Sequence, residues 1–238
     1  MKQTLADTAY EKLLEGIYSS ELRIEDRNDK TIKLEGGDKI VEQQVIDLLG
    51  ISRTPVREAI RRLAGDGLVD LCPGTFARVH TFTDKEKQDF GLVRLAIDTV
   101  AAPLVVLNGS NRDFQNLMSI TTECQRAFDN KDIMGRLQLD FKFHSTLVSL
   151  SGNHELTNIQ EQLTKRGLLM QIQTYNTKGS SFCDLTGHLV IIQALNARDT
   201  NASIRAMQDH LRHSYTSTPA NMQEWKNAET ALSSLKFA

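Results

Sequence analysis

Residues Leu48–Val69 read LLGISRTPVREAIRRLAGDGLV. Apolar side chains recur here with the spacing of one helix face, at Ile51, Val56, Ala59, Ile60 and Leu63. Arg53, Arg57 and Arg61 are four residues apart, so they line up along another side of the same helix. One face is therefore predicted to pack on a core, while the other presents a row of cations that matches phosphates or guanine edges.

The residues around this helix define its start. Ser52 or Thr54 can cap the N-terminus, and Pro55 falls in the first turn, where a missing backbone N–H costs nothing. Gly50 supplies a tight turn after a short amphipathic helix, whose apolar residues are Val41, Val45, Leu48 and Leu49. The two segments together predict a helix-turn-helix.

Two short strands follow the second helix. Leu68–Leu71 and Phe76–His80 have strand character, and the intervening Cys72–Thr75 segment contains Pro and Gly at positions suited to a turn. Such a hairpin forms a wing beside the helices. An arginine row alone is about as often a solvated helix face as a binding surface, but the row, the turn glycine and the wing together favour DNA binding.

The run Gly50–Val69 resembles the winged helix-turn-helix of GntR-family bacterial transcription regulators. Their recognition segment typically reads Ser-Arg-Thr-Pro-Val-Arg-Glu-Ala, as Ser52–Ala59 do here. The resemblance implies that residues 1–80 form a domain that binds double-stranded DNA at a palindromic operator, as part of a homodimer. The residues expected at the DNA are Ser52, Arg53, Thr54, Arg57 and Arg61, with Gly74 and Thr75 in the wing.

The overall composition is that of a globular protein, with 238 residues of which 40% are hydrophobic and 24% charged. The formal net charge is −2, so any attraction for DNA has to be local to the 52–62 helix and the wing.

The N-terminus is unlike a secretory leader, and we expect no apolar run long enough to span a bilayer, which predicts a cytoplasmic protein with no membrane partner. Cys72, Cys124 and Cys183 lack metal-ligand spacing and receive no role.

The rest of the first domain is predicted from its patterns. Tyr10, Leu13, Leu14, Ile17 and Tyr18 form a helical stripe, which predicts a first helix packed on the other two. Residues 23–37 are rich in Asp, Asn, Lys and Gly and are longer than the connection usual in the family. We interpret them as an inserted surface loop or small hairpin with few apolar residues to bury.

A second domain is predicted over residues 81–238. Thr83 and Glu86 form a capping box, and helical patterns then follow one another at 84–108, 112–130, 132–151, 154–175, 183–196, 200–216 and 221–235. The predicted fold class is mainly α, with an N-terminal winged helix-turn-helix followed by an all-helical antiparallel bundle. This second part resembles the FCD domain of the FadR subfamily, which implies a domain for effector binding and dimerisation.

A group of polar residues recurs beside the apolar stripes of this bundle. Asp140 and His144 are four residues apart on one predicted helix and share a face, while His188 and His210 lie on two later helices. Any one of these histidines alone is more often a hydrogen-bonded core residue than a ligand. FCD domains with Asp-x-x-x-His on one helix and single histidines on two later helices bind a divalent metal, so the resemblance implies these four residues as its ligands. The histidines that do not match this pattern are His80, His154 and His213.

Three imidazoles and one carboxylate suit Zn²⁺ or Ni²⁺ best, and Fe or Mn is also compatible. An octahedral ion would keep two positions open for the carboxylate of a small organic acid. Arg94 corresponds to an arginine common in the family and is expected to bind the same effector, although a surface arginine is an equally good interpretation of its position. Gly187 stands where these proteins often carry a Glu before the metal histidine.

The prediction is therefore a ligand-responsive transcription regulator with no catalytic residues. Two alternatives stay open: a regulator whose metal is purely structural and whose pocket takes a larger acyl effector, and a metal-dependent hydrolase. The sequence contains no HExxH motif and no nucleophile elbow, which weighs against the hydrolase. The effector, the operator and the metal are not specified by these patterns.

Overall fold

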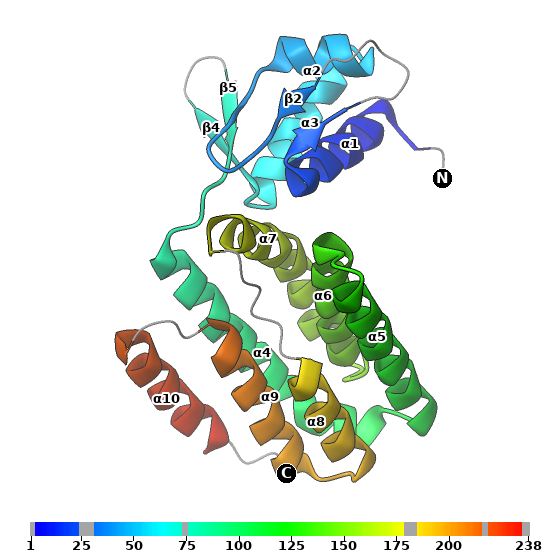
Figure 1. Cartoon of the computed structure of the whole chain (residues 1–238), viewed down its shortest axis with the longest axis vertical. Helices are drawn as coiled ribbons and strands as arrows, with labels where there is room; N and C mark the ends of the chain where they lie inside the picture. Colours follow the sequence, from blue (N-terminus) through cyan, green and yellow to red (C-terminus); the bar gives the residue numbers. More distant parts are fainter. Residues whose placement is uncertain (1–2, 24–30, 73–75, 179–184, 216–218, 235–238) are drawn as a thin grey trace. The chain divides into compact units, whose positions relative to one another are not determined.

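A computed structural model describes residues 3–23, 31–72, 76–178, 185–215 and 219–234 (Figure 1). The chain forms two compact units. The winged unit comprises Met1–Phe82 together with Leu168–Lys178, and the helical unit comprises Thr83–Gly167 together with Gly179–Ala238. The sequence pattern places the division after residue 80 and assigns Leu168–Lys178 to the second domain.

The N-terminal part of the winged unit, up to Phe82, contains three helices and two small antiparallel sheets among its described residues. Its elements are α1 (Leu5–Ser19), β1 (Glu21–Leu22), β2 (Ile32–Lys33), β3 (Lys39–Ile40), α2 (Glu42–Leu49), α3 (Arg53–Gly65), β4 (Val69–Cys72) and β5 (Phe76–Val79). The wing is a three-stranded sheet of order β3-β5-β4. The predicted helix-turn-helix is confirmed, and Gly50 adopts the left-handed conformation (φ 67°) that its turn requires.

The core of the winged unit is built by α1 and α3. Thr4 and Asp7 form a capping box at the start of α1, and the helix buries Leu13 and Ile17 as the stripe predicts. The predicted apolar face is confirmed as well, because Val56, Ala59, Ile60 and Leu63 of α3 are buried, and so is Ile51 in the turn before the helix.

The inserted segment is anchored more firmly than its composition suggests. β1 pairs with β2 in a short antiparallel ladder, which confirms the small hairpin. Leu34 is fully buried and Leu22 nearly so, and both side chains reach within 2.9 Å of where a Cβ on Gly16 would lie. The expectation of few buried apolar residues was therefore wrong at the base of the insertion, while residues 24–30 lie outside the described residues.

The helical unit consists of helices alone among its described residues, which confirms the predicted bundle. Its helices are α4 (Asp84–Asn108), α5 (Asn111–Asp129), α6 (Ile133–Ser149), α7 (His154–Lys178), α8 (Leu185–Asn196), α9 (Thr200–Tyr215) and α10 (Pro219–Ser233). α4 packs along α9, α5 along α6, and α8 along α9. The last turns of α7, from Leu168 onward, belong to the winged unit.

The first helix of the bundle is apolar on more than one side. α4 is, among the described helices, the one long and apolar enough to cross a membrane by length and composition, and 61% of its most apolar window is buried. The expectation that no apolar run reaches this length was wrong. The physical reason is that α4 supplies core residues such as Ile97, Ala101 and Val105 to the bundle while its remaining face is also largely uncharged.

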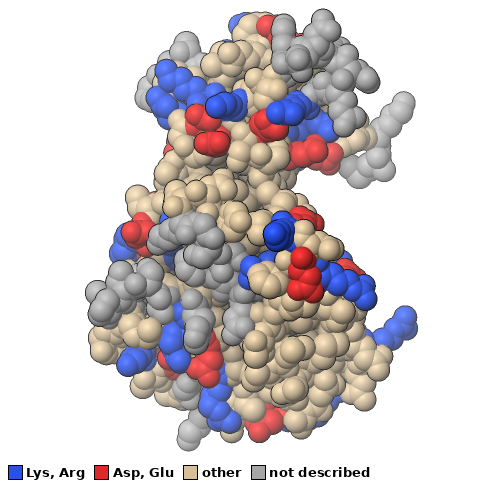
Figure 2. Space-filling model, in the orientation of Figure 1, with Lys and Arg blue, Asp and Glu red and all other residues tan. Residues whose placement is uncertain are grey.

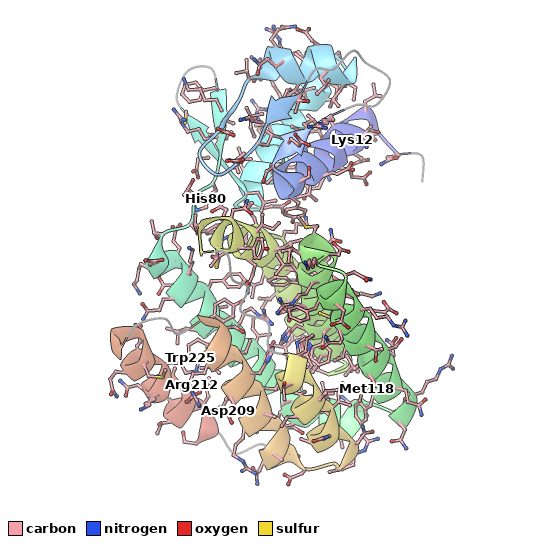
Figure 3. All side chains as sticks on the ribbon, in the orientation of Figure 1. Lys12, His80, Met118, Asp209, Arg212 and Trp225 are labelled. Atoms are coloured by element: carbon pink, nitrogen blue, oxygen red, sulfur yellow. The ribbon has the colours of Figure 1, made fainter. Side chains whose placement is uncertain are left out.

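The C-terminal helix α10 covers one end of α4 and α9. Trp225 is buried against Leu95 and Leu211, and its indole Nε1 donates a 2.8 Å hydrogen bond to Glu229 (Figure 3). Arg212 of α9 reaches the same carboxylate at 2.6 Å. These contacts dock α10 beside Tyr215, the last residue of α9.

Candidate metal centre and nucleic-acid interface

Three helices of the bundle bring the four candidate ligands together. Asp140 and His144 lie on α6, His188 on α8 and His210 on α9, and every one of these side chains is buried. One potential ligand atom from each residue lies within 4.8 Å of the others. The helical spacing that suggested a shared face for Asp140 and His144 is therefore realised, and the two later histidines face the same point.

Two close contacts define the interior of this cluster. Nε2 of His144 lies 3.1 Å from Nε2 of His210, and Nε2 of His188 lies 3.2 Å from Oδ1 of Asp140. The His188 ring stacks on Phe143 at a centroid distance of 3.9 Å, which fixes its plane. Four donor atoms thus converge in an apolar setting, a placement that is costly for polar groups without a shared partner.

Burial and neighbouring charges set the protonation of the cluster. Burial lowers the pKa of His144, and burial together with the neighbouring His188 and His144 lowers the pKa of His210 well below its ordinary value. Burial alone would raise the pKa of the Asp140 carboxyl, but the hydrogen bond from His188 holds that pKa below its usual range. Neutral imidazoles beside an ionised carboxylate are the forms that bind a cation.

The hydrogen-bond inventory tests whether these residues fit a metal. Nδ1 of His188 and Nδ1 of His210 are buried without a hydrogen-bond partner, and Oδ1 of Asp140 and Nε2 of His188 have only each other, at 3.2 Å. Buried polar atoms normally have partners, so their coincidence at one point calls for a shared one. The set of three imidazole nitrogens and one carboxylate oxygen fits a divalent transition metal.

Arg94 lies in the bundle interior with only 2% of its surface exposed, so it is no surface arginine. Its Nη2 donates to Oδ2 of Asp98 at 3.3 Å and its Nη1 to the hydroxyl of Tyr215 at 3.2 Å, while Nε has no partner. Burial opposes the guanidinium charge, yet Tyr215 and Asp98 keep the pKa of Arg94 above its ordinary value. A cation with one unused donor is therefore held close to the metal cluster.

Sequence reasoning missed Asp98 and Tyr215. Asp98 is fully buried on α4, and the same Oδ2 that binds Arg94 accepts a hydrogen bond from Nδ1 of His144 at 3.1 Å. The available signal was the spacing of four residues between Arg94 and Asp98, which places opposite charges on one helix face. Tyr215 carries no such signal, because only the folding of α9 against α4 brings it to Arg94.

Gly187 has a steric role in this centre. A Cβ built at this position would lie 2.4 Å from Nδ1 of His210, far inside van der Waals contact. No side chain at residue 187 can coexist with the present position of that imidazole. The glycine at residue 187 is thus matched to the close approach of α8 and α9.

The predicted DNA-binding side chains lie on the exposed face of the helix-turn-helix. Ser52 is the N-cap of α3, but its side chain makes no capping hydrogen bond, so that part of the capping prediction was wrong. Thr54, Arg53, Arg57 and Arg61 are exposed. A groove between α2, α3 and the wing is lined by residues that include the three arginines: Val41, Glu42, Gln43, Arg53, Arg57, Ile60, Arg61, Leu71, Cys72, Phe76 and Ala77.

Neighbouring polar groups engage these arginines. Arg57 forms a 2.8 Å salt bridge with Glu42, and Arg53 donates to Gln43 at 3.3 Å. Arg62, by contrast, pairs with Asp7 at 2.7 Å and belongs to the contact between α1 and α3. Figure 2 shows basic and acidic side chains interspersed on the visible face of the winged unit, in line with the small net charge. Gly74 and Thr75 lie outside the described residues.

Comparison with protein families decides the classification of this architecture. The FCD domain family matches residues 90–213, and the family of bacterial regulatory proteins named gntR matches residues 30–79. This chain is a GntR-family regulator with an FCD domain. The FCD match covers more than half of the sequence, and the recognition of both domains from their motifs is confirmed.

Relatives of this GntR-family regulator carry the same class of function. The chain is 25% identical over 178 residues to the uncharacterized HTH-type transcriptional regulator YdhC of Bacillus subtilis, covering 74% of this chain and 80% of that protein. It is 25% identical over 176 residues to the HTH-type transcriptional repressor RspR of Escherichia coli, covering 74% and 77%. The protein is accordingly a DNA-binding transcriptional regulator, and the relatives are consistent with a role other than catalysis.

Solved structures support the fold of the regulator. The structure of McbR/YncC from E. coli matches with a TM-score of 0.71 at 17% identity and covers 94% of this chain and 98% of that one. A GntR-type regulator from Rhodococcus matches with a TM-score of 0.64 at 19% identity, covering 98% and 97%. α1 and α10 lie outside the residues matched by the two family models.

Proposed function

We propose that this regulator senses a small carboxylic acid through a divalent metal held by Asp140, His144, His188 and His210. The observation that carries the proposal is the convergence of four buried ligand atoms within 4.8 Å, several of them without a hydrogen-bond partner. The ligand set favours Zn²⁺ or Ni²⁺, and Fe or Mn is compatible with the same donors. When bound, the metal supplies a Lewis acid with positions open to a carboxylate.

Arg94 provides the second half of the proposed acid site. Its buried guanidinium has one donor, Nε, that no protein group uses. A carboxylate that pairs with this cation gains a charge-assisted hydrogen bond in surroundings of low polarity. The same acid would therefore be held at one end by the protein's own cation, and small carboxylates fit this arrangement better than the uncharged end of a large acyl group.

The DNA contacts are proposed from the exposed row on α3. Arg53 and Arg57 reach base edges in the major groove, and Ser52, Thr54 and Arg61 contact phosphates. Gly74 and Thr75 of the wing contact the backbone or the minor groove. Because Glu42 holds Arg57 in the free protein, binding to DNA exchanges that salt bridge for a contact with the operator.

A homodimer on a palindromic operator, in the cytoplasm, completes the proposal. α4 supplies support for the second copy. Between Arg94 and Asn108 its only charged residue is the buried Asp98, and its outer side exposes Val93 and Leu107. Val100 and Leu104 lie on the same face at helical spacing and are half-buried. An uncharged stripe of this length suits an obligate interface between two copies.

The metal and the acid are tested together by elemental analysis and calorimetry. Purified protein is expected to contain about one metal ion per chain, and titration with a panel of small organic acids should give an affinity that falls after chelation. His188→Ala and His210→Ala should lose the metal and bind the acid more weakly, whereas His154→Ala, an exposed histidine on α7, should keep both properties. Undiminished acid binding by metal-free protein and by both site variants would refute the site.

The dimer is tested by sedimentation. Val100→Glu with Leu104→Glu should shift the protein toward monomer and weaken binding to a two-fold symmetric site, since two charges would be buried in the interface. Gln115→Glu, which adds a charge at an exposed position of α5, should leave the dimer intact. A wild-type monomer bound to an asymmetric DNA site would contradict the proposal.

A further inference from the structure

One carboxylate oxygen connects the two halves of the proposed effector site. Oδ2 of Asp98 accepts hydrogen bonds from Nδ1 of His144 at 3.1 Å and from Nη2 of Arg94 at 3.3 Å. Asp98 is fully buried, which raises the pKa of its carboxyl, but the contacts from Arg94 and His144 together hold that pKa below the ordinary value. A single ionised oxygen thus contacts a candidate metal ligand and the candidate acid-binding cation.

The contact with His144 selects one tautomer of that ring. A carboxylate can only accept, so Nδ1 of His144 must carry the proton and Nε2 must carry the lone pair. Nε2 is the atom that faces His210 at 3.1 Å inside the ligand cluster. Asp98 therefore presents His144 in the form that coordinates a metal, as outer carboxylates do for metal-bound histidines generally.

The contact with Arg94 has a different consequence. In protein without an acid, Asp98 is the only carboxylate in direct contact with Arg94 among the described residues, so it neutralises that cation in the bundle interior. A bound metal would draw electron density from the His144 ring and so strengthen the hydrogen bond from His144 to Asp98. The interaction between Asp98 and Arg94 would then weaken, which favours pairing of Arg94 with the carboxylate of an incoming acid.

We infer that Asp98 is a positioning residue that couples the two ligands, since it orients His144 for the metal and restrains Arg94 until an organic acid arrives. This inference rests on the metal and acid sites proposed above. The inference predicts that loss of the Asp98 charge affects metal affinity and acid affinity differently. Removing the charge at residue 98 should weaken metal binding while leaving acid binding to metal-free protein unchanged or tighter, because Arg94 loses its internal competitor.

The experiment uses full-length Asp98→Asn, with Asp129→Asn as the matched control, because Asp129 is an exposed carboxylate at the end of α5. Zn²⁺ or Ni²⁺ alone is titrated against a chelator. We expect affinity to fall roughly 10–100-fold in Asp98→Asn and not in the control. The acid identified in the calorimetric panel is titrated with and without saturating metal, and the gain in acid affinity that the metal gives should be smaller in Asp98→Asn than in wild type. Equal metal affinity in wild type and Asp98→Asn, or loss of acid affinity in the metal-free variant, would overturn the inference.

A second measurement does not depend on the variant or on the metal. ¹⁵N–¹H correlation spectra of the histidine rings in metal-free wild type, with His144→Gln to assign the signal, should show His144 protonated at Nδ1. A ring protonated at Nε2 would overturn the role of Asp98 even if metal binding were confirmed. Conversely, the Nδ1 form in a protein that binds no metal would support the contact with Asp98 and refute the metal proposal, so the two failures are distinguishable.

Discussion

Gly187 lies so close to His210 that a Cβ at residue 187 would be 2.4 Å from Nδ1 of the imidazole. Gly187→Ala should therefore push the His210 ring out of the ligand cluster and lower metal affinity, because both partners are helical backbone positions with little freedom to move apart. Elemental analysis and metal titration measure this effect. Gly65→Ala is the control, since a Cβ there meets nothing within 4 Å. Normal metal content in Gly187→Ala would show that α8 and α9 shift readily.

The arginine row predicts a contrast between neighbouring residues. Arg57→Ala should cost about 1–3 kcal/mol of operator affinity if its guanidinium reads a base, and Arg53→Ala should act similarly. Arg62→Ala is expected to leave DNA affinity unchanged and to lower thermal stability, because Arg62 pairs with Asp7 and lies over the ring of Tyr10. Binding titrations on operator DNA at fixed salt check this. An equal loss of operator affinity in all three variants would mean that DNA binding depends only on the overall charge of the domain.

The pair between Asp7 and Arg62 predicts a dependence of stability on pH. The hydrogen bond from Arg62, with those from Thr4, lowers the pKa of Asp7 to about 2 in the folded protein. A depressed folded pKa adds stability that is complete above the unfolded pKa of about 4 and is lost as the pH falls through about 2. The difference in urea midpoint between wild type and Asp7→Asn should thus shrink from pH 5 to pH 2. The same comparison made in Arg62→Ala should show a smaller change with pH.

The insertion predicts opposite outcomes at its base and at its tip. Replacing residues 24–30 with a short turn should change the melting temperature little, because loop length contributes weakly to closure entropy. Leu34→Ala should cost about 2–5 kcal/mol, since a fully buried side chain leaves a cavity next to Gly16. Denaturant unfolding measures both. A large loss on shortening would mean that the tip packs on another part of the protein.

The predictable parts of the fold were those with a long periodic pattern. The helices of the bundle have the expected order, and their ends agree with the expected ranges to within a few residues, because amphipathic stripes and capping pairs such as Thr83 with Glu86 are local signals. β3, only two residues long, has no periodicity to detect. Leu34 looked like a lone apolar residue in a polar loop, and only the hairpin shows that it fills the core.

Only the part of the candidate site that lies on one helix could be predicted from the sequence pattern. Asp140 and His144 share a helix face by spacing alone, whereas their proximity to His188 and His210 followed only from a family resemblance, because the separation of helices along the chain does not specify their packing. The sequence did not indicate that Glu42 pairs with Arg57, because Glu42 lies on the other helix of the motif. Interactions between elements are set by tertiary packing, and one sequence without its fold does not specify them.

Trp225 is the only tryptophan in the chain, and this makes the protein its own optical reporter. Its ring is buried and stacked at 11° to that of Tyr215, whose hydroxyl accepts a hydrogen bond from Arg94. An acid that pairs with Arg94 should change the environment of Tyr215. Because the Tyr215 ring stacks on Trp225, the fluorescence emission of the indole should change as well. Fluorescence of the unlabelled protein is therefore expected to follow occupancy of the proposed acid site in real time, and Tyr215→Phe would show how much of the signal passes through that hydroxyl.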